Sequence, residues 1–196
     1  MRIVRLGTRL LIGGLFVGHG AQKLAGAFDG PGIEGTAKMM DKIGMHPPKV
    51  NAYAAGITET VGGAMFALGS ATPLAGAALI GTMVTAIRKV HGPNGPWITQ
   101  RGWEYNAVLI AAIMAIVEDE YGVAAGLGAL GLGAAASAVT VELSQPAPEP
   151  TPYPTDLPAA EQTTGSAGSA SQKGDTGTVT TEPIRVEPSP SADSRG

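Results

Sequence analysis

Cysteine is absent from all 196 residues of the sequence. Disulfides, thiol nucleophiles and Cys-ligated iron–sulfur or zinc sites are therefore excluded. Basic residues are also few, with 13 Lys and Arg against 16 Asp and Glu, so the chain lacks the basic balance typical of nucleic-acid-binding proteins. No nucleotide loop, catalytic triad or metal-ligand spacing is present. Any sulfur redox chemistry would have to take place on a partner protein.

The apolar residues are concentrated in one part of the chain. Residues 1–143 hold nearly all the Leu, Ile, Val and Met, whereas residues 144–196 are mainly Pro, Ser, Thr, Gly and acidic residues without hydrophobic periodicity. Such a composition cannot bury a core. We therefore predict a membrane domain at 1–143 and a disordered tail at 144–196.

Long apolar runs in the first part predict an all-α fold, a polytopic membrane four-helix bundle with a fifth transmembrane helix. A helix needs about 20 apolar residues to cross a bilayer. We expect spans at residues 3–25, 50–70, 73–91, 103–117 and 121–141. For the first run the alternative is a signal peptide, which the later spans disfavour. For the last run, the alternative to a fifth span is a surface extension of the fourth helix.

The longest connection, residues 26–49, includes a segment with helical spacing of charged and apolar residues at 34–43. We expect a short helix there, either at the membrane surface or as an ordinary connector on the bundle. Counting Lys and Arg favours a cytoplasmic position for this side of the bundle, whereas the three arginines at the N-terminus favour the reverse.

Glu59 lies near the middle of the second predicted span without a charged neighbour in that span. On insertion scales a charge at this depth costs about 2.5–3.5 kcal/mol. Glu59 therefore needs a polar partner on another helix or a function that justifies the cost.

The ends of the predicted spans bring other polar residues to one side of the membrane. The first and third spans end on the side where the second and fourth begin. The candidate site consists of His19, Gln22, Lys23, Glu59, Arg88, His91, Asn94 and Glu104. We expect a pocket for the head group of a quinone or similar amphiphile, or a proton relay. The alternative is a structural network of ion pairs and hydrogen bonds. A haem between His19 and His91 would need a wide gap, which small-residue packing around Glu59 disfavours.

Six motifs in the same order resemble the DoxX family of small bacterial membrane proteins. The resemblance covers roughly residues 3–117. The motifs are His19-Gly20-x-Gln22-Lys23, Gly30-Pro31-Gly32-x-Glu34-Gly35-Thr36, Glu59-x-x-Gly62-Gly63, Gly69-x-x-Thr72-Pro73, His91-x-x-Asn94-Gly95 and Gly102-x-Glu104-Tyr105.

The resemblance implies a multi-pass protein of the bacterial plasma membrane. The family is similar to the small membrane subunits of quinone-linked thiosulfate oxidation. In mycobacteria-like organisms its members are linked to oxidative-stress complexes with a superoxide dismutase and a sulfurtransferase-like protein. We therefore expect a membrane subunit of a redox or oxidative-stress assembly, with soluble redox or sulfur-transfer partners, a quinone as the ligand and no independent activity.

Two other functions fit the sequence. The chain could be a non-catalytic scaffold that tethers soluble stress enzymes through residues 26–49 and the tail. It could also be a small-solute transporter that uses Glu59, although the chain shows no inverted repeat of the kind found in many transporters.

Overall fold

The structure is a computed structural model that describes residues 2–145. Within this range the chain forms six α-helices and no strands, which confirms the all-α fold. The helices are α1 (Arg2–Ala25), α2 (Gly32–Lys42), α3 (Pro48–Leu68), α4 (Thr72–Ala86), α5 (Glu104–Tyr121) and α6 (Val123–Leu143). Nearly all of the predicted tail, residues 144–196, lies outside the described residues.

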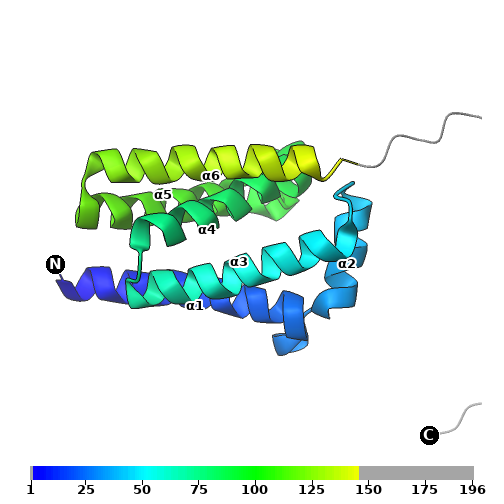
Figure 1. Ribbon diagram of the computed structural model, residues 1–196, viewed down its shortest axis with the longest axis horizontal. Coiled ribbons are helices and arrows are strands. Elements are labelled where there is room, and N and C mark those ends of the chain that lie inside the picture. The colour runs from blue at the N-terminus through cyan, green and yellow to red at the C-terminus, as the bar shows by residue number, and fades with distance from the viewer. Residues whose placement is uncertain (1, 146–196) are drawn as a thin grey trace, which may run out of the picture. The chain divides into compact units, whose positions relative to one another are not determined.

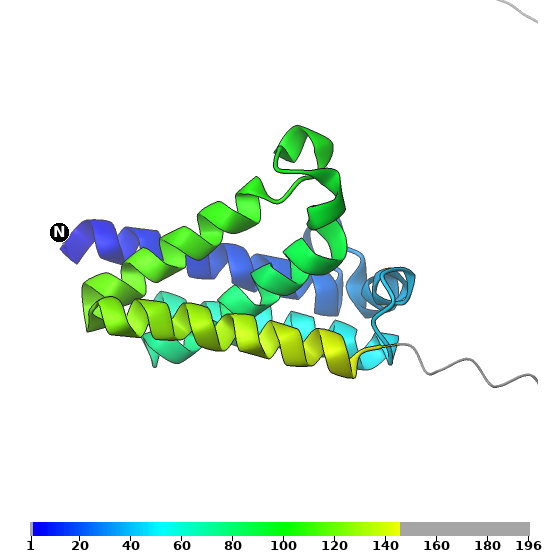
Figure 2. The same ribbon diagram turned by 90° about the horizontal axis from the view of Figure 1, so that it is seen from above.

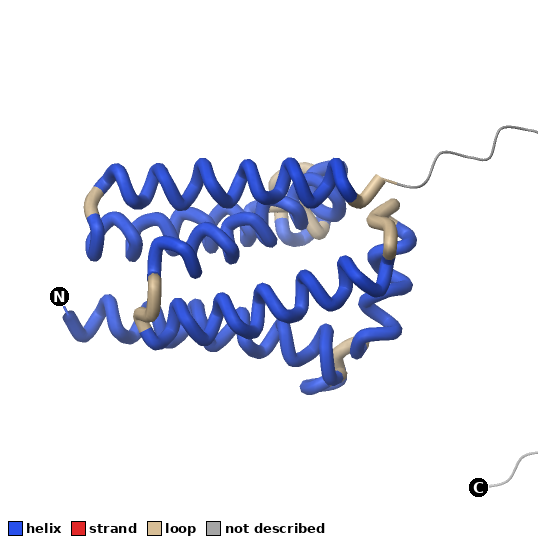
Figure 3. The backbone as a smooth tube through the Cα atoms, viewed as in Figure 1, coloured by secondary structure: helices blue, strands red, loops and turns tan. Residues whose placement is uncertain are grey.

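The long helices form two layers (Figure 1). α1 packs against α3 in one layer, and α4, α5 and α6 pack together in the other. α2 crosses one end of the bundle and contacts both α1 and α3, short turns join α3 to α4 and α5 to α6 at the other end, and residues 87–103 form a longer connection between α4 and α5 (Figure 3). The expected connector helix at 34–43 is therefore confirmed as a helix that covers the end of the bundle.

Glycines let α1 and α3 approach closely. A Cβ added to Gly63 would lie 2.7 Å from the carbonyl oxygen of Gly13, and one added to Gly20 would lie 2.7 Å from the carbonyl oxygen of Gly56. Backbones come this near where the residue at the contact has no side chain. The Gly14-x-x-x-Gly18 pair does not take part, because no atom lies within 4 Å of a Cβ built on Gly14 or Gly18.

The fifth long helix, α6, is a separate element and not an extension of α5. The chain reverses at Gly122, whose φ of 87° is a backbone conformation that favours glycine. α5 and α6 spread from this turn like the arms of a V (Figure 2). α6 also packs on α4, where a Cβ on Gly133 would lie 2.7 Å from the carbonyl oxygen of Ala77.

The buried apolar core lies in the half of the bundle that includes the α3–α4 and α5–α6 turns. Its largest fully buried side chains are Phe16, Phe66, Leu79, Ile80, Ile113 and Val117. A second, smaller core joins α2 to α3 through Met40, Met45 and Ala52. Residues of both cores, such as Phe16 and Met40, also line a cavity between the two layers.

The outward faces of the long helices are strongly apolar. Exposed large side chains occur on each of them, including Leu11 (63% exposed), Ile57 (50%), Leu74 (59%), Val108 (63%) and Leu132 (55%). Contiguous apolar surface on this scale marks contact with a membrane or with other proteins. Among the described residues, two helical segments, Thr72–Asn94 and Val123–Leu143, are long and apolar enough to cross a bilayer.

Candidate functional site

Glu59 on α3 is buried and paired with Lys23 on α1. The Lys23 Nζ donates to Glu59 Oε2 at 2.5 Å, and the side chains are 20% and 7% exposed. The α1–α3 glycine contacts hold the two helices close enough for this pair. The cost of the isolated carboxylate predicted a polar partner on another helix or a function for Glu59, and the partner in the structure is the cation of Lys23.

A cavity of about 670 Å³ lies between the two helical layers, beside this ion pair. Most of its wall is apolar, including Leu15, Phe16 and Leu109, and α2 contributes Met39 and Met40. Its size falls within the range of small-molecule sites, which are about 300–1,000 Å³, mostly apolar and provided with a few polar groups.

Five of the eight predicted site residues line the cavity. They are His19, Gln22, Lys23, Glu59 and His91. His19 is exposed, as is Tyr105 on the opposing α5, and both line the cavity. Both residues therefore lie where the cavity wall reaches the surface of the protein.

Arg88, unlike five of the predicted site residues, is not part of the cavity wall. Arg88 is exposed, while its neighbour Lys89 is half-buried and lines the cavity. Both lie in a short π-helix, Ile87–His91, that continues α4. The prediction placed Arg88 and His91 on one face by α-helical spacing, but the wider π-turn breaks that spacing. A regular spacing of four from Thr85, which lines the cavity, leads to Lys89.

Asn94 and Glu104 also lie outside the cavity wall, where they stabilise the loop between α4 and α5. The Asn94 side-chain amide donates to the carbonyl oxygens of Val90 and Arg101, each at 3.3 Å. Glu104 Oε1 accepts a hydrogen bond of 2.6 Å from the backbone N–H of Ile98. For these two residues the hydrogen bonds therefore agree with the alternative interpretation of the polar cluster, which is a structural network.

His91 both lines the cavity and stabilises the loop between α4 and α5. Its Nδ1 lies 2.8 Å from the carbonyl oxygen of Arg101, so the ring holds the same loop while it lines the cavity. Gly102 closes the loop, because a Cβ there would meet Pro96 at 2.5–2.7 Å. The motifs His91-x-x-Asn94-Gly95 and Gly102-x-Glu104-Tyr105 thus stabilise the loop that precedes α5 and position the start of α5 at the cavity.

Asn106 on α5 is a cavity residue that the sequence analysis missed. It is 6% exposed and lines the cavity. Its only side-chain partner among residues 2–145 is the Met83 Sδ at 3.3 Å, a weak acceptor, and its side-chain oxygen accepts no hydrogen bond there. A polar amide inside the apolar run 105–117 was the available signal, since such a group is costly in a membrane unless it has a partner.

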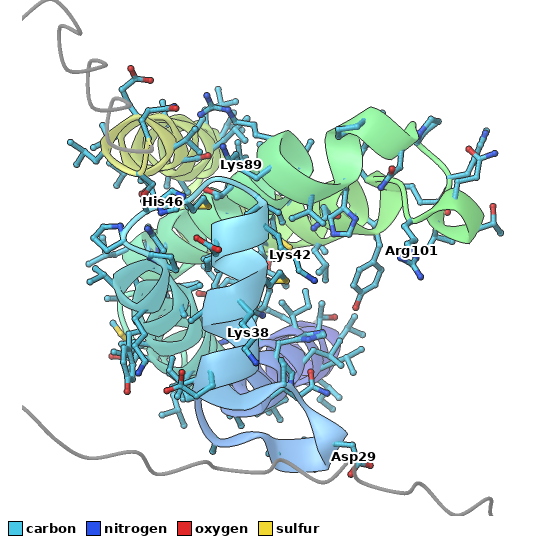
Figure 4. All side chains as sticks on the ribbon, turned by 90° about the vertical axis from the view of Figure 1, so that its right-hand side faces the viewer. Asp29, Lys38, Lys42, His46, Lys89 and Arg101 are labelled. Atoms are coloured by element: carbon cyan, nitrogen blue, oxygen red, sulfur yellow. The ribbon has the colours of Figure 1, made fainter. Side chains whose placement is uncertain are left out.

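The end of the bundle beside the cavity is rich in basic side chains (Figure 4). Lys38 and Lys42 lie on α2, which crosses in front, while Lys89 lies near α6 and Arg101 lies on the loop before α5. α2 is tied to α1 by the Thr36 hydroxyl, which donates to the carbonyl oxygen of Lys23 at 3.3 Å.

Lys49 at the start of α3 forms an exposed ion pair with Glu34 on α2. The Lys49 Nζ lies 2.7 Å from Glu34 Oε1. The hydrogen bond to the Glu34 carboxylate, together with its negative charge, raises the pKa of Lys49 above its ordinary value. This pair lies outside the cavity wall and resembles the buried Lys23–Glu59 pair in chemistry alone, which makes it a natural control.

Comparison with known proteins agrees with the motifs. The DoxX family model matches residues 4–92, from α1 to the end of the π-helix. The match includes Lys23, Glu59 and Lys89, whereas Asn106, on α5, lies beyond it. No curated protein and no solved structure matches this chain. The match confirms the predicted resemblance to the DoxX family over residues 4–92, and together with the apolar helices it indicates a membrane protein.

Proposed function

We propose that this protein is a membrane subunit of a redox or oxidative-stress assembly and binds the head group of a quinone or similar amphiphile. The observation that carries the proposal is the cavity of about 670 Å³, whose wall is mostly apolar and which holds the buried Lys23–Glu59 pair. An apolar ring with polar oxygens needs a site of this character.

We place the five long helices across the bacterial plasma membrane. Support comes from the apolar outward faces and from helix length, since α6 with 21 residues is about 30 Å long at 1.5 Å per residue. In this arrangement the exposed part of the cavity wall, which includes His19 and Tyr105, opens toward lipid. An amphiphile would enter there from the bilayer and leave its apolar tail outside.

The polar groups of the cavity suit the oxygens of a quinone. The Asn106 amide has a hydrogen-bonding capacity that Met83 meets only weakly. A quinone carbonyl would accept from its NH₂ group and restore a full hydrogen bond. Lys23 and Glu59 line the same cavity and supply a second polar contact.

Electron transfer to such a ligand requires a partner. The sequence has no cysteine to carry thiol chemistry or an iron–sulfur cluster. We propose a soluble redox or sulfur-transfer enzyme as that partner, with this chain holding the quinone in the membrane.

The proposal predicts that binding of a short-chain ubiquinone depends on Glu59. Full-length protein in lipid nanodiscs is titrated by calorimetry, and Glu59→Gln is compared with Glu34→Gln. Glu59→Gln leaves Lys23 without its counter-charge and disturbs the cavity wall, so we expect Kd to rise about tenfold or more. Glu34→Gln removes the matching carboxylate of an exposed pair outside the cavity and is expected to bind as the wild type does.

A second variant keeps the test decisive if Glu59→Gln does not fold. Asn106→Leu removes a buried amide that has one weak partner. The leucine side chain suits the apolar surroundings, so the fold tolerates the change. We expect this variant to retain its thermal stability and to bind the quinone about tenfold more weakly. Absence of quinone binding by the wild type, or equal affinity in all variants, would contradict the proposed function.

A further inference from the structure

The cavity wall carries one more positive charge than negative charge. Its Lys, Arg, Asp and Glu residues are Lys23, Glu59 and Lys89. Glu59 neutralises Lys23 at 2.5 Å. No carboxylate of residues 2–145 lies within 4.0 Å of a Lys89 nitrogen, so Lys89 is the cation that remains uncompensated in the described part of the chain.

Lys89 occupies a place where an unpaired cation is unfavourable. It is half-buried at the end of α4, and its surroundings include the apolar cavity residues Ala86 and Val90. A charge beside apolar surface at the membrane is stabilised by a counter-ion or by water. The cavity also presents hydrogen-bond donors on other helices, namely Tyr105 on α5 and Ser137 and Thr140 on α6.

This charge balance limits the kind of ligand that fits. A neutral quinone would leave Lys89 without a counter-ion. A head group that is ionised near neutral pH would pair with Lys89 while its ring or chain lies on the apolar wall. In a cavity of low polarity, such a pair is stronger than it would be in water.

We infer that the natural ligand is an acidic amphiphile, whose head-group anion pairs with Lys89. This inference rests on the proposed function and narrows its ligand to quinones with an ionisable hydroxyl, or to amphiphiles with a carboxylate. Lys89 is then the residue that selects acidic over neutral head groups.

The test uses two probes that differ in charge and by one methyl group. One is a naphthoquinone with an alkyl tail and a ring hydroxyl beside the carbonyl, which ionises near neutral pH as a vinylogous carboxylic acid. The other is its methyl ether, which is neutral. Binding to the full-length protein in nanodiscs is measured for the wild type, for Lys89→Gln and for Arg88→Gln. Arg88 is the exposed neighbour outside the cavity and serves as the matched control.

We expect the wild type and Arg88→Gln to bind the hydroxyl compound about tenfold more tightly than the ether. Lys89→Gln is expected to bind the two compounds about equally, because the amide cannot neutralise an anion. Its affinity for the ether should match that of the wild type, which also shows that the variant is folded.

Each other outcome separates the two proposals. If the wild type binds both compounds equally well, the acidic ligand is ruled out and the quinone site stands. A preference that persists in Lys89→Gln overturns the role of Lys89. Dodecanoate serves as a third probe. If it binds the wild type but not Lys89→Gln, and neither naphthoquinone binds, the quinone site is rejected and the acidic head group is supported. No binding of any probe rejects both.

Discussion

At the scale of single residues, Arg9 joins three helices at the end of the bundle opposite the cavity. Its Nε and Nη2 donate to the carbonyl oxygens of Phe66 and Ala67 at the end of α3, and its Nη1 lies 2.7 Å from Glu120 on α5. Gly69 makes room, because a Cβ there would collide with the guanidinium group. Only the planar fork of arginine offers donors in this arrangement.

Replacing Arg9 by lysine should therefore destabilise the protein while keeping its charge. Lysine can retain the ion pair with Glu120 but cannot reach all three acceptors, so we expect a loss of about 1–3 kcal/mol. The melting temperature in detergent should fall by several degrees. Arg88→Lys, at an exposed site, should leave it unchanged. Equal effects of the two substitutions would show that the hydrogen bonds of Arg9 do not stabilise the fold.

Single site residues could be predicted where burying a charge carries a clear free-energy cost. A carboxylate in an apolar span needs a partner, which led to the pairing of Glu59 with a cation on another helix. Arg88 was assigned to the site in place of Lys89 because its spacing to His91 was taken as α-helical, although both residues lie in a π-helix. Glu104 was placed in the cluster because spacing along the chain does not distinguish a loop acceptor from a cavity wall.

At the scale of elements, helix positions followed from the apolar runs to within a few residues, with the fourth span as the exception. α5 continues to Tyr121, beyond the predicted end at residue 117. Acidic residues in a last turn are unfavourable for the helix dipole. Here Asp119 and Glu120 are compensated by Arg5 and Arg9 of α1, a contact between segments more than 100 residues apart that sequence periodicity cannot reveal.

Neighbouring glycines on α1 provide a test of helix packing. A Cβ on Gly13 would lie 2.7 Å from the Cβ of Ala67 and would also collide with Gly63, so Gly13→Ala must push α1 and α3 apart at a cost of about 1–3 kcal/mol. Gly14→Ala meets no atom within 4 Å and should stabilise the helix by about 0.5–1 kcal/mol. Thermal unfolding in detergent distinguishes the two. Similar destabilisation by both would disprove close packing at Gly13.

At the scale of the whole molecule, the polar residues predicted a pocket, but its width could not be predicted. The small residues around Glu59 were expected to leave no gap wide enough for a haem. The closest contacts act within layers, as between Gly13 and Gly63 in one layer and Gly133 and Ala77 in the other, whereas Gly62 of α3 faces Leu79 of α4 less tightly. Close packing within layers does not fix the distance between them, and the cavity of about 670 Å³ lies in that space.

A five-span arrangement predicts which loops share a side of the membrane. Because the chain has no cysteine, single cysteines introduced at exposed loop positions report on one site each. Ser70→Cys and Tyr121→Cys should be labelled from one side of intact cells or vesicles by a membrane-impermeant maleimide. Lys42→Cys and Thr99→Cys should be labelled only from the other. Labelling of all four from the same side would rule out five crossings.

The ion pairs between α1 and α5 have a consequence for the order of events during synthesis. Arg5 emerges 114 residues before Asp119, and Arg9 emerges 111 residues before Glu120. While the first helix enters the bilayer, both arginines are therefore bare charges that can steer its orientation. Once α5 arrives, its carboxylates cancel them. The same two side chains thus guide insertion first and fasten the finished bundle afterwards.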